Sequence, residues 1–158
     1  KKINEILLEE KKIDHYSYER LAKRIDNTKK NIRYFLDWVG NENVIGYGAS
    51  TKGNIVLNQC NLNSKNLKLI CDANPYKHNR YTPGSNIRII SKEEMRKIKP
   101  KYLFVLIWSF RKEVIKQEID YIKNGGKLVF HLPMFHIIDK ENYKEYLKDD
   151  FKTFSFEY

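Results

Sequence analysis

The sequence is poor in cysteine and contains no long hydrophobic run. Its 158 residues include two cysteines, Cys60 and Cys71, whose spacing is not that of paired zinc ligands or of a redox motif. The longest apolar run, Tyr102–Trp108, is far too short to span a bilayer, and no signal-peptide hydrophobic stretch follows the basic amino terminus. These absences predict a cytoplasmic protein with inert thiols, no metal site and no membrane partner.

Two common phosphate-loop motifs are absent as well. The stretch NVIGYGASTKGN contains Gly46, Gly48 and Gly53, but the third glycine arrives two residues too late for the dinucleotide motif G-x-G-x-x-G. Lys52 precedes the last glycine, whereas the lysine of a Walker loop follows it. NAD and ATP therefore both lose support as ligands.

Apolar and charged residues are both plentiful. Hydrophobic residues make up 41% and charged residues 32% of the chain, which is typical of a soluble folded domain. The net charge of +10 indicates an acidic partner, which is nucleic acid, an anionic membrane or a phosphorylated small molecule. Lys112, Lys116 and Lys123 alternate with acidic residues, as on an ordinary solvated helix face, so we do not expect nucleic acid to be the partner.

The apolar pattern changes its period along the chain. Three- and four-residue spacing predicts a long amphipathic helix from Ser17 to Val39, which Gly40 ends. Strands are predicted at 44–47, 67–71, 87–90, 102–107 and 127–132, with a further edge strand at 153–158, and helices at 51–60, 91–99, 110–123 and 139–148. This order predicts an α/β, Rossmann-like three-layer domain whose mostly parallel sheet has about five strands.

The same pattern predicts the domain organisation. We expect residues 1–158 to form a single domain with its core at 17–133 and a carboxyl-terminal extension at 134–158. Residues 1–16 are interpreted as a linker, or as a helix from a preceding domain, because Lys1 stands where an uncut chain would begin with methionine.

The glycine-rich turn at 46–53 is the first candidate for a binding site. In a Rossmann-like fold, ligands bind beyond the carboxyl ends of the strands, which is where this turn is expected. Glycine there lets the backbone approach a ligand closely, and the amides at the following helix start form an anion site. The same glycines would also let the helix pack tightly on a strand, and the turn by itself leaves both interpretations open.

A long polar loop, DANPYKHNRYTPG at 72–84, follows the second predicted strand. Its first residue, Asp72, either binds a ribose, as a carboxylate near this place does in dinucleotide enzymes, or only forms a turn. A loop of this length inside a compact domain is usually functional or mobile. Its side chains include cations suited to phosphates and rings suited to stacking on a base: Lys77, His78, Arg80, Tyr76 and Tyr81.

The fourth predicted strand ends in the segment LIWSFRKE, at the same edge of the sheet. An aromatic ring beside an arginine suits a nucleotide, so Trp108 and Arg111 are candidate ligand contacts. Phe110 is interpreted as a cap of the core at a helix start.

Four segments occur in order between residues 17 and 133: GYGASTKGN, DANPYKHNRYTPG, LFVLIWSFRKE and NGGKLVFHLP. Together they resemble the carboxyl-terminal domain of the S-adenosylmethionine-dependent sugar C-methyltransferases, which act on nucleotide-linked deoxysugars. Three positions depart from the family pattern: Asn79 replaces a usual glycine, Ile107 a proline, and Ser109 a histidine or asparagine. The last departure argues against a polar role at Ser109.

The resemblance implies that different domains of such an enzyme bind the cofactor and the substrate. In this family a preceding methyl-donor domain holds S-adenosylmethionine and supplies the acid–base residues. The present domain is therefore expected to bind the nucleotide-linked deoxysugar, to hold no cofactor or catalytic residue of its own, and to be inactive in isolation. The implied substrate-binding residues are Gly46, Gly48, Ala49, Ser50, Lys52, Gly53, Asn54, Asp72, Asn74, Pro75, Lys77, Arg80, Tyr81, Trp108 and Arg111.

Two other functions stay open on the sequence alone. An NAD(P)-binding oxidoreductase module fits the fold, although the glycine spacing argues against it. A basic nucleic-acid-binding domain fits the net charge of +10, although the sequence contains no recognised nucleic-acid-binding motif.

Overall fold

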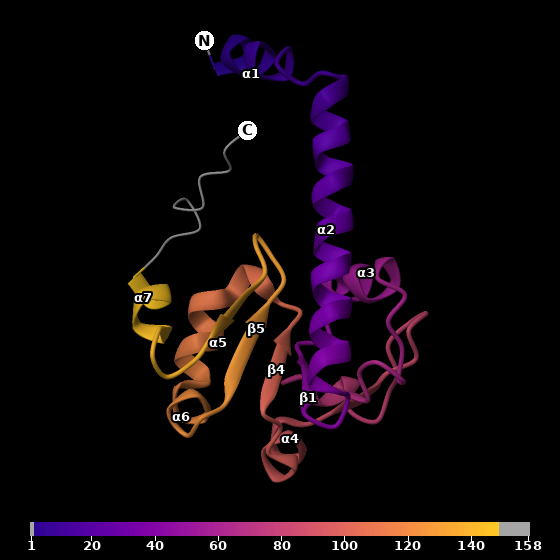
Figure 1. Cartoon of the computed structure of the whole chain (residues 1–158), viewed down its shortest axis with the longest axis vertical. Coiled ribbons are helices and arrows are strands. Elements are labelled where there is room, and N and C mark those ends of the chain that lie inside the picture. The colour runs from indigo at the N-terminus through magenta and orange to yellow at the C-terminus, as the bar shows by residue number, and fades with distance from the viewer. Residues whose placement is uncertain (1, 149–158) are drawn as a thin grey trace.

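The computed structural model describes residues 2–148. Its longest helix, α2 (His15–Val39), begins two residues before the predicted start because Asp14 and Ser17 form a capping box. The Asp14 carboxylate accepts a 2.8 Å hydrogen bond from the Ser17 amide, and Gly40 ends the helix at φ +70°. The buried residues of α2 all lie among its last eight residues, so its first half and helix α1 (Lys2–Glu10) extend beyond the sheet (Figure 1).

A six-stranded sheet in the order β3-β2-β1-β4-β5-β6 forms the centre of the described domain. Its strands are β1 (Val44–Tyr47), β2 (Leu69–Cys71), β3 (Arg88–Ile90), β4 (Tyr102–Val105), β5 (Lys127–Phe130) and β6 (His136–Ile138). The first five are parallel, as the sequence predicts, and β6 pairs antiparallel with β5. β6 was not predicted: its segment follows Pro133 closely and shows no run of apolar residues longer than Ile137 and Ile138.

Helices cover both faces of the sheet, which confirms the Rossmann-like three-layer prediction (Figure 1). Helix α2 and helix α3 (Thr51–Gln59) pack on one face, where Phe104 of β4 lies. The opposite face, with Leu103, is covered by α4 (Lys92–Ile98), α5 (Arg111–Gln117), α6 (Ile119–Lys123) and α7 (Tyr143–Lys148). None of the helices in the described range is both long and apolar enough to cross a membrane.

Several element boundaries differ from the predicted ones. The predicted helix at 110–123 is divided into a 3-10 turn, η2 (Trp108–Phe110), and helices α5 and α6, which are separated at Glu118. The turn directs Phe110 outward with 56% of its surface exposed, so its interpretation as a core cap was wrong.

The carboxyl-terminal prediction holds in part. Helix α7 begins at Tyr143 rather than at Asp139, because the Asp139 carboxylate accepts a hydrogen bond from the Glu141 amide and shapes a turn there. The strand predicted at 153–158 lies outside the described residues.

Candidate functional site

The candidate site lies at the carboxyl edge of the sheet, where β1 and β4 are neighbours and the strand order reverses. Open α/β sheets bind ligands at this kind of switch point because the loops on its two sides diverge and leave a crevice. The glycine turn follows β1, Asp72 follows β2, and Trp108 follows β4 by three residues. The fold therefore brings the main sequence-predicted segments to one edge.

Gly48 is the tightest point of the glycine turn. Its backbone has φ +87°, a conformation that side chains other than glycine rarely adopt, and its amide donates a 2.8 Å hydrogen bond to the Cys71 carbonyl. A Cβ atom at Gly48 would lie 2.6 Å from Cγ2 of Ile107. Packing inside the domain is thus enough to require glycine here, and contact of Gly48 with a ligand stays a prediction.

The other two glycines also lie against neighbouring strands. A Cβ at Gly53 would lie 2.7 Å from Cβ of Leu106, and one at Gly46 would lie 2.7 Å from Cγ1 of Ile70. The contact at Gly53 sets the first turn of α3 directly on the residue that follows β4, and the contact at Gly46 packs β1 against the Ile70 side chain of β2.

The first turn of α3 presents two kinds of polar group. Ser50 caps the helix, since its hydroxyl accepts a 3.0 Å hydrogen bond from the Gly53 amide. Lys52 is exposed, and its ammonium lies 5.9 Å from the centroid of the half-buried Trp108 ring, within the range of a cation–π contact. Asn54 has a buried side-chain oxygen without a hydrogen-bond partner in the described part of the chain.

Asp72 joins the glycine turn to the polar loop. Its carboxylate accepts hydrogen bonds from the amides of Ala49 and Asn74, both at 2.8 Å, and from the Lys77 ammonium at 3.2 Å. Lys77 also donates to the Ala49 carbonyl at 2.9 Å. Asp72 is 9% exposed, and its carboxylate oxygens already accept hydrogen bonds from these internal partners. Its presence is therefore explained by the fold, and a bound ribose is not needed to explain it. Lys77 likewise acts inside the fold, although its side chain is 39% exposed.

The polar loop holds its shape through local hydrogen bonds. Pro75 begins a 3-10 turn, η1 (Pro75–Lys77), which the Asn74 side chain caps by accepting from the Tyr76 amide. Arg80 donates its Nε–H to the Tyr76 carbonyl at 2.8 Å. Asn79 has φ +60°, a left-handed conformation that asparagine tolerates better than most residues other than glycine, in agreement with the glycine that the family resemblance implies at this position. Tyr76 is 83% and Tyr81 is 57% exposed, as stacking surfaces would be.

Arg111 does not lie with the other candidates. It is fully buried at the start of α5, and its guanidinium lies 5.2 Å from the centroid of the Tyr146 ring, on the α7 side of the sheet. The 3-10 turn before α5 rotates Arg111 inward, so it does not face the ligand edge that the sequence predicted for it.

His131, which the sequence analysis did not select, is also at this edge. It directly follows β5 and is 1% exposed, with its ring centroid 5.4 Å from that of Phe104. Burial lowers its pKa to about 4, a shift that the nearby Val105 backbone opposes only partly. The signal that could have found it is a histidine at the end of an apolar strand, in the segment LVFHLP.

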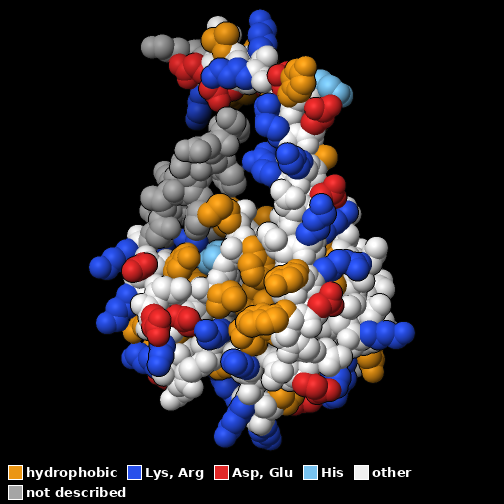
Figure 2. Space-filling view, viewed as in Figure 1, with side chains coloured by type: hydrophobic (Ala, Val, Ile, Leu, Met, Phe, Trp, Pro, Cys, Tyr) orange, Lys and Arg blue, Asp and Glu red, His pale blue; other side chains and the backbone are white. Residues whose placement is uncertain are grey.

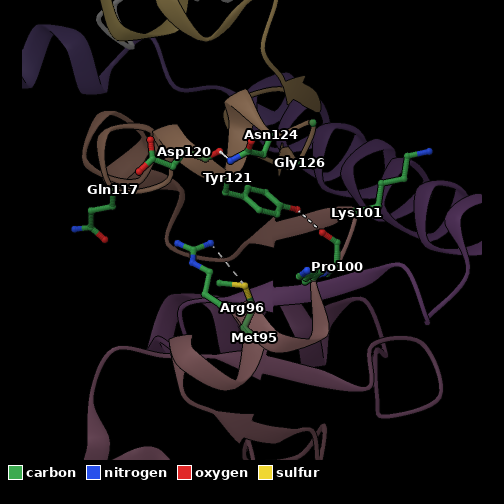
Figure 3. A pocket seen from close by; sticks show the side chains of 11 residues that line it. Met95, Arg96, Pro100, Lys101, Gln117, Asp120, Tyr121, Asn124 and Gly126 are labelled. Atoms are coloured by element: carbon green, nitrogen blue, oxygen red, sulfur yellow. Dashed lines mark hydrogen bonds between the residues drawn. The ribbon is translucent and has the colours of Figure 1, made fainter.

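A cavity of about 600 Å³ lies at the opposite edge, beside the residues that precede β4 and β5 (Figure 3). Two of its polar side chains are bonded within the chain: the Tyr121 hydroxyl donates to the Pro100 carbonyl at 2.9 Å, and Arg96 pairs with Glu118. A Cβ at Gly126 would meet the Tyr121 ring, so the wall is tightly packed there. The cavity is at the amino ends of the strands, away from the switch point, and we do not assign the ligand to it.

No group of three or more His, Cys, Asp or Glu side chains within residues 2–148 is placed to hold a metal ion.

The comparisons with known proteins agree with the motif order. A family model described as "C-methyltransferase C-terminal domain" matches residues 1–133. The C-methyltransferase NovU of Streptomyces niveus is 30% identical over 127 residues, which are 79% of this chain and 30% of that protein. The chain thus spans about a third of the length of this relative. From its fold, its motifs and these matches, the chain belongs to the family of C-methyltransferase C-terminal domains.

Proposed function

We propose that this chain is the domain of an S-adenosylmethionine-dependent sugar C-methyltransferase that binds the nucleotide-linked deoxysugar. The observation that carries the proposal is the arrangement at the switch point. The amino end of α3, the Lys52 ammonium and the Trp108 ring converge there, and the polar loop, with the exposed Tyr76 near its start, begins after β2 at the same edge. A helix amino end with a cation suits a pyrophosphate, and the rings suit a base.

The hydrogen bonds of the glycine turn indicate which backbone amides could bind the phosphates. Internal acceptors occupy the amides of Gly48, Ala49, Ser50, Gly53 and Asn54. The first amides of a helix have no partner within the helix, so those of Thr51 and Lys52 are the ones left to meet an anion. The pyrophosphate is therefore expected at the first turn of α3 rather than over the glycines themselves.

The domain's part in catalysis is to position the substrate. S-adenosylmethionine, held by another domain of such an enzyme, supplies the methyl group that is transferred to a carbon beside a keto group. This chain neutralises the pyrophosphate through Lys52 and fixes the sugar's orientation, which reduces the entropy cost of the reaction. Proton transfer is assigned to the methyl-donor domain, so the isolated chain is expected to be inactive.

Neither alternative function gains an observation that favours it. Lys and Arg side chains are spread over the visible surface and interspersed with acidic ones, rather than gathered in a single groove (Figure 2). A nucleic-acid site needs a continuous basic track. For NAD, the Asp72 carboxylate that would receive a ribose is already bonded to Ala49, Asn74 and Lys77.

Calorimetric titration of the 158-residue chain tests the proposal. We expect binding of thymidine diphosphate and thymidine diphosphate glucose, and none of NAD, S-adenosylmethionine or a DNA duplex. Replacing Lys52 by Ala should weaken thymidine diphosphate binding about tenfold, the effect of losing one charge-assisted hydrogen bond. The matched control is Lys123→Ala, at an exposed position of α6, which should leave thymidine diphosphate affinity unchanged. Absence of thymidine diphosphate binding up to millimolar ligand, or preferential binding of NAD, would contradict the proposal.

A further inference from the structure

His131 is a buried polar side chain that the fold does not use. Neither of its ring nitrogens makes a hydrogen bond of normal geometry within residues 2–148, and the Val105 backbone, which lies near enough to oppose the lowering of its pKa in part, is not such a partner. Buried polar groups in native proteins nearly always have a partner, because an unmade hydrogen bond inside the protein costs stability. An apolar residue of similar size would pack beside Phe104 without this cost, so stability alone gives no reason for histidine here.

The position of His131 relates it to the candidate site. Val105 of β4 is paired with Phe130 of β5, so the residues that follow them, Leu106 and His131, are also neighbours. The contact of His131 with the Phe104 ring places its side chain on the face of the sheet that α2 and α3 cover. Leu106 is the residue on which Gly53, in the first turn of α3, packs. The imidazole thus lies one strand away from the expected pyrophosphate position.

The strand order indicates which part of the ligand would reach His131. The polar loop, with Tyr76 near its start, follows β2 on one side of the first turn of α3, and His131 follows β5 on the other side. With the pyrophosphate between them and the base against Tyr76, the sugar extends toward β5. A neutral imidazole has one donor and one acceptor nitrogen, which suits a sugar hydroxyl or carbonyl.

We propose that His131 is a substrate-binding residue that hydrogen-bonds the sugar of the nucleotide-linked substrate. The inference rests on the proposed function, and it adds a specificity-determining residue to that site. Because the imidazole is buried in this structure, contact requires the segment 132–135, which follows it directly and is partly exposed, to shift when the sugar binds.

The test compares two ligands that differ only in the sugar. Affinities for thymidine diphosphate and thymidine diphosphate glucose are measured for the wild-type chain and for His131→Leu, His131→Gln and His136→Leu. His136 is the matched control, since it stacks on Phe130 and Tyr146 on the opposite face of the sheet. Thermal melting of each variant accompanies the titrations.

We expect the wild-type chain to bind the sugar nucleotide more tightly than the diphosphate. His131→Leu should reduce that preference about fivefold to tenfold, the effect of one hydrogen bond, while thymidine diphosphate affinity stays unchanged and the melting temperature stays equal or rises. His131→Gln keeps a donor and an acceptor and should retain part of the preference. His136→Leu should retain all of it.

Two results would overturn the inference while leaving the proposed function intact. One is an unchanged sugar preference in His131→Leu, and the other is equal affinity of the wild-type chain for both ligands. A wild-type chain that binds neither ligand would instead overturn the proposed function, and this inference with it. A lower melting temperature in His131→Leu with unchanged sugar preference would assign the imidazole a structural role.

Discussion

Asp72 and Glu118 are both buried carboxylates, but they hold different kinds of donor. Asp72 accepts from two loop amides and one lysine at the carboxyl edge of the sheet. Glu118 is fully buried beneath the sheet and accepts from side chains of β1 and α4: the Tyr47 hydroxyl at 2.8 Å, Lys92 at 3.5 Å, and Arg96. The first carboxylate therefore shapes the ligand edge, and the second connects two layers of the fold.

The two networks also differ in whether they lie near the candidate ligand site. Burial and the negative charge of Glu118 raise the pKa of Tyr47 well above its usual range, so this phenol stays protonated and serves as a fixed donor. The donors to Glu118 come from β1 and α4, whereas the Asp72 network holds Ala49 in the glycine turn that leads into α3. Damage to Glu118 should thus affect stability alone, and damage to Asp72 should also affect binding.

The largest expected effect is that of Glu118→Ala. Removing this carboxylate leaves the Tyr47 hydroxyl without its main acceptor and Arg96 without its partner, and should lower the free energy of unfolding by about 3–4 kcal/mol. Urea denaturation measures the loss, and Glu113→Ala on the exposed face of α5 is the control that should stay within about 0.5 kcal/mol. A loss below about 1 kcal/mol for Glu118→Ala would show that the network contributes little.

His131 differs from Asp72 and Glu118, because it is a buried titratable side chain whose ring nitrogens make no hydrogen bond of normal geometry in the described residues. Its pKa of about 4 in the folded state lies below the ordinary 6.5, so the unfolded chain takes up the proton first as the pH falls. The contribution of His131 to stability should be complete above pH 6.5 and should fall by about 2–3 kcal/mol as the pH is lowered toward 4. His131→Leu should remove this contribution and leave the smaller acid sensitivity of His136, whose pKa burial also lowers. Thermal melting at a series of pH values measures this loss of stability. An equal loss in acid for the wild-type chain and for His131→Leu would contradict the prediction that His131 causes it.

The glycine turn that Asp72 holds can be tested at Gly48. Gly48→Ala should destabilise the domain by about 2 kcal/mol, because it combines an unfavourable positive φ with a clash against Ile107. The control is Gly125, which has a similar φ of +92° but no neighbouring atom within 4 Å of where a Cβ would lie, so Gly125→Ala isolates the backbone cost and should lose only about 1 kcal/mol. Equal losses at the two positions would show that Ile107 yields easily. Ile107→Ala in the Gly48→Ala background should recover part of the difference.

The smallest effect on stability is expected for Asp72→Asn. The new amide keeps the shape of the carboxylate but turns one acceptor oxygen into a donor that faces other donors, which should cost about 1–2 kcal/mol. Hydrogen exchange at the Ala49 and Asn74 amides should accelerate, and thymidine diphosphate affinity should fall. Glu118→Gln provides the contrast, since it should leave exchange at these two amides unchanged. Unaltered hydrogen exchange at these amides in Asp72→Asn would mean that the turn keeps its shape without the hydrogen bonds of the Asp72 carboxylate.

Much of the fold could be predicted from local patterns. Alternating apolar runs and helical periods define five parallel strands and their crossover helices, because each period reports which side of an element is buried. The pattern missed β6, which follows β5 after a short connection through Pro133, and it missed the break at Glu118, where the buried carboxylate interrupts a helix that was predicted to be continuous. The break at Glu118 has no local signature, since its partners Tyr47, Lys92 and Arg96 lie far away in the sequence.

The sequence by itself determined the family, the Rossmann-like architecture and the edge at which a ligand is expected, since motif order and hydrophobic period are properties of neighbouring residues. Only the tertiary structure decided which side chains reach that edge. It turned Arg111 into the interior, engaged Asp72 and Lys77 in internal hydrogen bonds, and set His131 one strand from the first turn of α3. These roles depend on contacts between strands that are distant in the chain, and such contacts exist only once the sheet has formed.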